Sequence, residues 1–593
     1  MKKTPVCYTI RPLNPEAHRF EVSCSVSCPD PAGQRFALPA WIPGSYLIRD
    51  FARHIVAIRG ESGGKPVRLR KIDKHTWEAV PPAGTAPLTI TCEIHAWDLS
   101  VRGAHLDETH GFFNGTSVFL RVIGQEDSPC LVAIRPPDGD AYADWRVATA
   151  LDPARGEPGC AKPHGFGAYR AANYDELIDH PVEMGRFSLA RFSACGVPHE
   201  IAITGRHDCD LDRLSADLQR ICEWQIRFFG EPAPMKRYVF LVTAVGEGYG
   251  GLEHRASTAL LCSRHDLPYR GMRALTEGYR SFLGLCSHEY FHTWNVKRIK
   301  PSAFTPYNLD RENYTAQLWA YEGITSYYDD LALLRCGAIE LKDWLTLTGK
   351  TIGNVMKTPG RLRQSLADSS FDAWSKFYRP DENTPNAVVS YYAKGALVAL
   401  ALDLELRSQS DVSLDDVMRA LWLRHGMSGV GTDDDSVRQI AEALSGLKLK
   451  RFFADYVHGT RELPLKRLLA AFDIRLEFTP GKTPSIGAKT ASEAGELKLA
   501  TAFDGGAAQR AGLASGDILV AIDGLRVTPA SLEGMLARHQ PDDSLKIHAF
   551  RRDELMEFTL QLDPPAVESA QLAPRSEKKG EVASARRIAW LGQ

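Results

Sequence analysis

The 593-residue sequence predicts a multidomain protein with an N-terminal all-β domain, a central mainly α-helical domain and a C-terminal α+β domain. Short runs that alternate apolar and polar residues, separated by Pro, Gly and Asp clusters, fill residues 1–190 and are typical of β-strands. Residues 191–478 begin with strand-like runs and a long helical pattern at 210–230, and then become mainly helical. Residues 484–563 combine strand patterns with a Gly-Gly turn and a short Ala-rich helix, and 564–593 are predicted to form a polar, mobile tail that ends in an apolar segment.

Composition is that of an ordinary globular protein, with 44% hydrophobic and 24% charged residues. The 71 basic and 73 acidic residues nearly cancel, so the net charge of −2 does not indicate nucleic acid or an anionic membrane as a partner. The amino terminus has no apolar segment typical of a secretory signal. No run approaches the ~18 apolar residues of a membrane span.

The cysteines indicate a reducing compartment. Twelve are dispersed along the chain, and none follows Cys336. There is no CxxC pair with zinc-site spacing and no small secreted scaffold that disulfides would stabilise. We therefore expect reduced thiols and a cytoplasmic protein.

The sequence His288-Glu289-Tyr290-Phe291-His292 is an HExxH motif inside a helical pattern that spans 272–294. Residues four apart lie on one face of an α-helix, so both histidines can reach a single metal ion. Glu289 is next to that face, where it can contact a water on the metal without binding the metal itself. The alternative is a pair of hydrogen-bonded histidines on a buried helix.

A catalytic zinc ion needs a third protein ligand and one open position. Residues 314–334 form an apolar helical pattern that is interrupted by Glu322 and Gly323. A carboxylate among such apolar neighbours is costly to bury unless it is paired or bound to a metal. Glu322 is therefore the candidate third ligand, and the alternative is an exposed helical residue.

The two motifs together form the gluzincin pattern, and the chain resembles the glycyl aminopeptidase family of zinc peptidases. The resemblance covers nearly the whole chain through stretches at 41–55, 174–187, 248–258, 288–301, 321–328, 390–407 and 452–460. It implies one Zn²⁺ per chain, bound by His288, His292 and Glu322, in a thermolysin-like catalytic domain at 191–478. It also implies that the stretch 41–55, which we expect to be a turn with an aromatic anchor, faces that domain.

The stretch Gly250-Gly251-Leu252-Glu253-His254 resembles the G-x-M-E-N signature of larger zinc aminopeptidases, with Leu252 and His254 replacing Met and Asn. In those enzymes the backbone pairs with the substrate as an edge strand, and the glutamate binds the free α-ammonium. The resemblance implies the ammonium-binding role for Glu253 and a substrate-binding role for the stretch. The alternative is a glycine turn with a solvated acid.

The stretch Tyr392-Ala393-Lys394-Gly395 matches the Y-x-K-G of related aminopeptidases, whose tyrosine donates a hydrogen bond to the oxyanion of the tetrahedral intermediate. Tyr391 is the nearby alternative, and packing is the alternative role for both. Thermolysin-like sites often carry an acid four residues after the ligand glutamate. That position here is Ser326, so Thr325, Ser326 and Asp329 all remain candidates for orienting a zinc ligand.

Residues 484–563 resemble a PDZ domain, in which an extended peptide adds a strand to a sheet edge and backbone amides bind its carboxylate. The resemblance implies a possible peptide ligand; a purely structural copy is the alternative.

Taken together, these patterns predict a zinc aminopeptidase in which Glu289 is the general base and Tyr392 the oxyanion donor. Its substrates would be peptides with a free N-terminus. The family resemblance adds a preference for Gly or Ala as first residue. A zinc endopeptidase would share the metal residues but would not use Glu253 on an amine. A non-catalytic PDZ scaffold is disfavoured by the intact motif.

Overall fold

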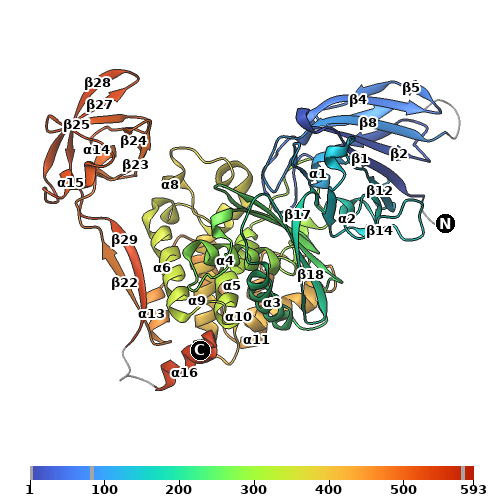
Figure 1. Ribbon diagram of the computed structural model, residues 1–593. Coiled ribbons are helices and arrows are strands. Elements are labelled where there is room, and N and C mark those ends of the chain that lie inside the picture. Colours follow the sequence, from blue (N-terminus) through green and yellow to red (C-terminus); the bar gives the residue numbers. More distant parts are fainter. Residues whose placement is uncertain (1–3, 80–85, 576–580, 593) are drawn as a thin grey trace. The chain divides into compact units, whose positions relative to one another are not determined.

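β-Strands dominate the first 190 residues, as the alternating patterns predict, and Figure 1 traces the chain. The structure is a computed structural model that describes residues 4–79, 86–575 and 581–592. The described chain separates into two compact units. Unit 1 comprises Met1–Asn313, Cys336–Ala338 and Trp422–Gly431, and unit 2 comprises Tyr314–Arg335, Ile339–Leu421 and Thr432–Gln593.

The largest sheet of unit 1 follows the order β14-β15-β12-β1-β2-β8-β4-β5. Its strands are β14 (Asp152–Pro153), β15 (Gly167–Ala171), β12 (Cys130–Ile134), β1 (Val6–Asn14), β2 (Arg19–Val26), β8 (Leu88–His95), β4 (Ile55–Ser62) and β5 (Lys65–Val67). Every second residue of β2 and of β8 is buried, and Phe20 pairs with Ile94 and Val22 with Cys92. One face of this sheet therefore covers a core, which explains the period-two pattern in the sequence.

Two smaller sheets complete the N-terminal β-sheet domain. One contains β13 (Arg146–Thr149), β16 (Val182–Gly185), β10 (His110–Phe113) and β9 (Ala104–Leu106), and the other β11 (Arg121–Val122), β3 (Gln34–Ala37), β7 (Thr76–Ala79) and β6 (Leu69–Lys71). The short helices α1 (Gly115–Val118) and α2 (Tyr174–Ile178) lie between strands in the sequence. The hairpin of β9 and β10 is paired through β10 to β16, so it is attached to the sheet by backbone hydrogen bonds.

A mixed sheet and two long helices form the remainder of unit 1. The sheet order is β17 (Phe187–Ala194), β18 (Val197–Thr204), β19 (Tyr238–Val245), β21 (Ser257–Ser263) and β20 (Tyr249–Glu253). Within the described residues, β20 pairs with β21 alone, so it is an edge strand, as predicted for the stretch Gly250–His254. Helices α3 (Leu211–Phe229) and α4 (Glu277–Phe291) pack together, and α4 also packs on β20 and β21.

Side-chain caps define where the two long helices begin. The Asp210 carboxylate accepts a hydrogen bond from the Arg213 amide at the start of α3, and the Thr276 hydroxyl accepts one from the Tyr279 amide at the start of α4. The predicted helix at 272–294 is therefore shorter than its apolar pattern, because Thr276 caps it after the first four residues.

Helices dominate the first half of unit 2, which matches the prediction of a central helical region. They are α5 (Ile324–Arg335), α6 (Leu341–Lys357), α7 (Leu366–Phe371), α8 (Thr384–Ala387), α9 (Ala393–Gln409), α10 (Leu414–Leu421), α11 (Ser436–Ser445), α12 (Lys450–Tyr456) and α13 (Leu465–Ala470). Helices α5, α6, α10 and α13 all contact α9, whose side chains are buried on nearly every side. Its buried Asp403 accepts hydrogen bonds from Tyr327 and Arg407, so this carboxylate is paired.

The C-terminal region is rich in β-strands. A sheet runs in the order β23 (Ala488–Glu493), β24 (Glu496–Ala502), β25 (Ile518–Ile522), β27 (Ser544–Arg551) and β28 (Glu554–Gln561), with β26 (Leu525–Arg526) beside β25. Together with α14 (Ala507–Arg510) and α15 (Leu532–Leu536), it encloses a separate apolar core that includes Leu499, Leu519 and Ile547. Among the described residues, no helix combines the length and apolar character needed to cross a membrane.

Part of the segment after Pro564, for which the polar composition predicts a mobile tail, forms regular structure, and residues 576–580 of that predicted tail lie outside the described residues. Strand β29 (Val567–Pro574) pairs antiparallel with β22 (Ile474–Pro480) and packs on α6. Helix α16 (Glu581–Leu591) ends in the buried Trp590, whose indole N–H donates to the Tyr327 hydroxyl at 2.8 Å. The apolar segment near the end of the chain thus secures this region, because one large aromatic ring is buried there.

Replacing Trp590 tests this attachment. Its ring contacts Trp344 and Phe472, so Trp590→Ala should remove buried area and a hydrogen bond and lower the free energy of unfolding by about 3–5 kcal/mol. Ile588→Ala is the matched control on the same helix, because Ile588 is exposed and should change stability by less than about 0.5 kcal/mol. Urea unfolding measures both; equal effects would mean that Trp590 does not secure the segment.

Candidate active site

Helix α4 presents two histidines at its C-terminal end. His288 lies in the last turn and His292 follows as the capping residue, and their Nε2 atoms are 3.0 Å apart. The His292 Nδ1 lies 2.7 Å from the Asn295 carbonyl oxygen, so Nδ1–H donates to it and the Nε2 lone pair points toward His288. The helix pattern thus brings the two ring nitrogens of the HExxH motif together, as predicted.

The geometry of this pair fits a metal ion. Two nitrogen ligands of one tetrahedral zinc ion, each at about 2.0–2.1 Å from the metal, lie about 3.3 Å from each other. The observed separation of the His288 and His292 nitrogens is close to that value. A divalent cation satisfies both lone pairs at once, and the Asn295 carbonyl is the kind of outer partner that orients a metal-binding imidazole.

The edge strand β20 lies directly against the general-base candidate. A Cβ atom at Gly251 would be only 2.0 Å from Oε1 of Glu289, so the absence of a side chain at this position leaves room for the carboxylate. Glu289 is buried, and atoms of Glu253, Glu289 and His292 all lie within 4.8 Å of one another. Two carboxylates this close repel each other, which favours a cation beside them.

Glu253 is the last residue of β20, and its carboxylate packs against a loop of the N-terminal domain. A Cβ atom at Gly44, where φ is +98°, would lie 2.6 Å from both Glu253 oxygens. The loop is a turn closed by the Ser45 amide donating to the Ile42 carbonyl. Its anchor is Trp41, which is fully buried and donates through Nε1 to the Asn308 carbonyl at 2.8 Å. This matches the predicted turn with an aromatic anchor at 41–55.

The other predicted residues of the stretch have different surroundings. A Cβ atom added at Gly250 would make ordinary van der Waals contact with the Arg102 guanidinium, 3.8 Å away, and Arg102 donates to the Gly251 carbonyl at 3.4 Å. The His254 side chain is buried, and its Nδ1 lies 3.4 Å from Asp179. His254 therefore projects into a cluster of charged groups behind the strand.

That cluster is centred on Asp179, a residue that motif reasoning did not single out. The Lys297 ammonium is 2.6 Å from Asp179 Oδ1, and the Arg255 amide donates to Oδ2 at 3.0 Å. Burial raises the pKa of Asp179, but the charges of Lys297 and Arg255 hold it well below its usual range. Burial lowers the pKa of His254, so its ring is neutral at neutral pH. The only sequence signal for Asp179 is its place in the stretch 174–187.

In unit 2, Glu322 lies in a π-helical turn, η6 (Trp319–Gly323), that leads into α5. The Ile324 amide donates to the Trp319 carbonyl five residues earlier, which widens the helix at Glu322. Glu322 is buried, as its apolar neighbours predict. A Cβ atom at Gly323 would lie 2.6 Å from the Gly395 Cα, so two glycines let this turn touch the start of α9.

The tyrosine pair at the start of α9 divides into one buried and one accessible ring. Tyr391 is fully buried, and burial raises the pKa of its phenol well above the usual range. Tyr392 is half-buried, stacks on Tyr391 with ring centroids 4.7 Å apart, and has its hydroxyl 3.3 Å from that of Tyr378. The spacing to Lys394 and Gly395 favours Tyr392, with Tyr391 as the alternative, and carries no signal for Tyr378.

The candidates for orienting a zinc ligand remain three. The Thr325 hydroxyl donates to the Tyr321 carbonyl within its own helical segment. Ser326 and Asp329 lie in α5 and are half-buried. Thr325, Ser326 and Asp329 therefore stay predictions.

Paired imidazole nitrogens, a carboxylate beside them and a sheet edge that ends in a second carboxylate are the arrangement expected of a metal-dependent peptidase. Comparison with known families agrees: residues 7–186 match the Peptidase M61 N-terminal domain, and residues 281–398 match M61 glycyl aminopeptidase. The crystal structure of an aminopeptidase N family protein from Idiomarina loihiensis is 41% identical, covers 99% of this chain and 100% of its own, and has a TM-score of 0.93. The chain belongs to the M61 glycyl aminopeptidase family and is a metalloaminopeptidase, a hydrolase of peptide bonds.

More distant similarity is weak. The crystal structure of an M1 zinc metallopeptidase from Deinococcus radiodurans is 13% identical, covers 78% of this chain and 95% of its own, and has a TM-score of 0.49. No functional argument follows at that level. A comparison with curated proteins gives no match.

Substituting Gly251 tests the contact between β20 and α4. Gly251→Ala should displace the Glu289 carboxylate, because the new methyl group would occupy its position, and should lower kcat at least tenfold while the circular dichroism spectrum stays unchanged. The matched control is Gly246→Ala in the turn before β20, where an added Cβ meets no atom within 4 Å. Full activity of Gly251→Ala would show that Glu289 does not need this space.

Proposed function

We propose that this enzyme removes the first residue of peptides with a free N-terminus, at one zinc ion bound by His288, His292 and Glu322. The observation that carries the proposal is the position of Glu253, a buried carboxylate at the end of an edge strand and within 4.8 Å of Glu289 and His292. An extended peptide adds to such an edge by main-chain hydrogen bonds. A carboxylate at its end binds an ammonium and disfavours a blocked terminus.

The donor set supports zinc. His288, His292 and Glu322 offer two imidazoles and one carboxylate, ligand types that suit one zinc ion and leave a fourth position open. All three lie in the segment that matches M61 glycyl aminopeptidase. A zinc ion bound there supplies a Lewis acid that makes water acidic enough to lose a proton at neutral pH.

The roles of the protein side chains follow from their surroundings. Glu289 accepts a proton from the attacking water and passes it to the leaving amine. Tyr392 donates a hydrogen bond to the oxyanion, a contact worth on the order of 3 kcal/mol when the donor is preorganised. Tyr392 is half-buried, which supports its choice over Tyr391, which is fully buried.

Substrate binding is assigned to the edge strand. Gly250 and Gly251 present a backbone without side chains to the peptide, and Glu253 binds its α-ammonium. His254 positions Glu253 rather than touching the substrate, because its ring is directed toward Asp179. The preference for Gly or Ala as first residue is supported by the family description alone.

The same zinc site could serve an endopeptidase, which is the second candidate function. Glu253 argues against it, since a buried acid at the end of the strand is poorly matched to a continuing, uncharged chain. A non-catalytic scaffold is disfavoured because the chain retains the paired histidines and Glu289 beside them.

We further propose the domain boundaries 1–190, 191–478, 484–563 and 564–593, with a thermolysin-like catalytic domain and a PDZ-like domain at 484–563. The separate apolar core of the last β-rich region supports an independent domain that could bind a peptide. Twelve dispersed, free cysteines support a reducing compartment such as the cytoplasm.

The zinc content of variants distinguishes a residue that binds the metal from the residue that acts as general base. Glu322→Ala should bind one zinc ion per chain fewer than the wild type, because a site with three ligands has no spare. Glu289→Gln should bind as much zinc as the wild type yet lose turnover by about 10²–10⁴-fold, because the amide cannot accept the proton. Elemental analysis and initial rates measure the two effects, and unchanged zinc in Glu322→Ala would remove that residue from the ligand set.

A single peptide with a free or an acetylated N-terminus decides between the two peptidase classes. The contact between Glu253 and the ammonium is charge-assisted, worth ~1.5–3 kcal/mol, so the acetylated peptide should show at least a tenfold lower kcat/KM. Glu253→Ala should lose most of this discrimination by slowing cleavage of the free peptide. Comparable kcat/KM values for both peptides with the wild type would contradict the aminopeptidase proposal and favour the endopeptidase.

A further inference from the structure

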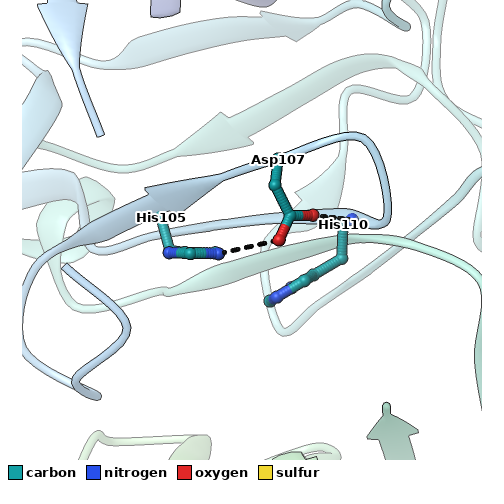
Figure 2. Close-up of side chains that lie close together, drawn as sticks. All are labelled: His105, Asp107 and His110. Carbon is teal, nitrogen blue, oxygen red and sulfur yellow. Dashed lines mark hydrogen bonds and ion pairs between the residues drawn. The ribbon is translucent and has the colours of Figure 1, made fainter. Parts of the chain in front are cut away.

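We propose that His105, Asp107 and His110 form a second metal site, in the N-terminal domain, which binds a divalent transition-metal ion such as Zn²⁺. The three residues lie on the hairpin of β9 and β10, and Figure 2 shows both rings and the carboxylate gathered at its turn. Each offers one ligand atom, and these atoms lie within 4.8 Å of one another. The cluster lies within unit 1 and shares no residue with the HExxH motif.

The turn itself holds the Asp107 carboxylate in place. Its Oδ1 accepts hydrogen bonds from the Thr109 amide at 2.7 Å, the Thr109 hydroxyl at 2.6 Å and the His110 amide at 3.0 Å. The other oxygen of the carboxylate, Oδ2, faces His105 with Nε2 at 3.2 Å (Figure 2). That separation is close to the ~3.3 Å expected between two ligands of one tetrahedral zinc ion.

The His110 ring is oriented by a second carboxylate. Its Nδ1 lies 3.0 Å from Oε1 of Glu183 on β16, and both side chains are buried. When the ring is neutral, its Nδ1–H group donates to Glu183 and Nε2 carries the lone pair. A carboxylate that fixes the tautomer of an imidazole in this way is the usual outer partner of a metal-binding histidine. The carbonyl of Asn295 does the same for His292.

The surroundings suit a small dication. Two imidazoles and a carboxylate are ligands that zinc and similar ions share, and the negative charges of Asp107 and Glu183 balance a charge of +2. The His105 and His110 ring centroids are 5.0 Å apart, and both residues also line a small, otherwise mainly apolar cavity of about 10 Å³ that does not include Asp107. Asp107 is 22% exposed, so an ion can reach the cluster from solvent.

Zinc content in four proteins tests this proposal. They are the wild type, the His288→Ala/His292→Ala variant, the His105→Ala/His110→Ala variant and the variant with all four changes. After equilibration with Zn²⁺ and dialysis, elemental analysis should give about two, one, one and zero ions per chain. Because each site is removed separately, failure of the catalytic site and failure of the hairpin site give different patterns.

Two further measurements guard against loss of the hairpin fold. Asp107→Asn keeps an oxygen acceptor for the Thr109 and His110 amides but loses the charge, so in the His288→Ala/His292→Ala background it should weaken zinc binding at least tenfold in a titration. Co²⁺ in the same background should give the visible absorption of a low-symmetry nitrogen and oxygen site, and His105→Ala/His110→Ala should remove it. A His288→Ala/His292→Ala protein that holds no zinc, or whose zinc is unchanged by His105→Ala/His110→Ala, would overturn the proposal and leave a hydrogen-bonded hairpin.

Discussion

The contact between the edge strand β20 and helix α4 is the constraint on which the active site depends. Gly251 has no side chain, and the Glu289 carboxylate occupies the space where one would be. The Glu289 carboxylate therefore lies between this strand and helix α4, which presents His288 and His292. Because the same strand ends at Glu253, the spacing between the Glu289 and Glu253 carboxylates is determined by the backbone of a paired strand rather than by a loop.

Much of this arrangement could be predicted from local patterns. The period of two in β2 and β8 and the helical period of α3 and α4 arise because each element buries one side, and that regularity is visible in the residues themselves. The HExxH spacing likewise follows from the helical repeat, so the pairing of His288 and His292 needed no knowledge of the fold. The position of Gly250–His254 at the edge of a sheet was predicted from the resemblance of this stretch to the G-x-M-E-N signature.

Other features depend on contacts between residues distant in sequence, which no single sequence displays. Asp179 contacts Lys297, more than a hundred positions later, and neither residue by itself signals this buried ion pair. In the C-terminal segment, Trp590 donates a hydrogen bond to the hydroxyl of Tyr327 in α5. The polar residues that precede Trp590 carry no signal for this contact. The hairpin cluster of His105, Asp107 and His110 needed Glu183 from another strand to become recognisable.

The loop around Gly44 has a consequence for how this enzyme could be shortened or recombined. Trp41 and Gly44 belong to the N-terminal β domain, yet one is bound to the Asn308 carbonyl and the other lies against the Glu253 carboxylate. Excising the β domain would open Glu253 to water, and the electrostatic interactions of its carboxylate would weaken as the local dielectric constant rises. A recombined enzyme would therefore have to keep the segments around Gly44 and Glu253 together.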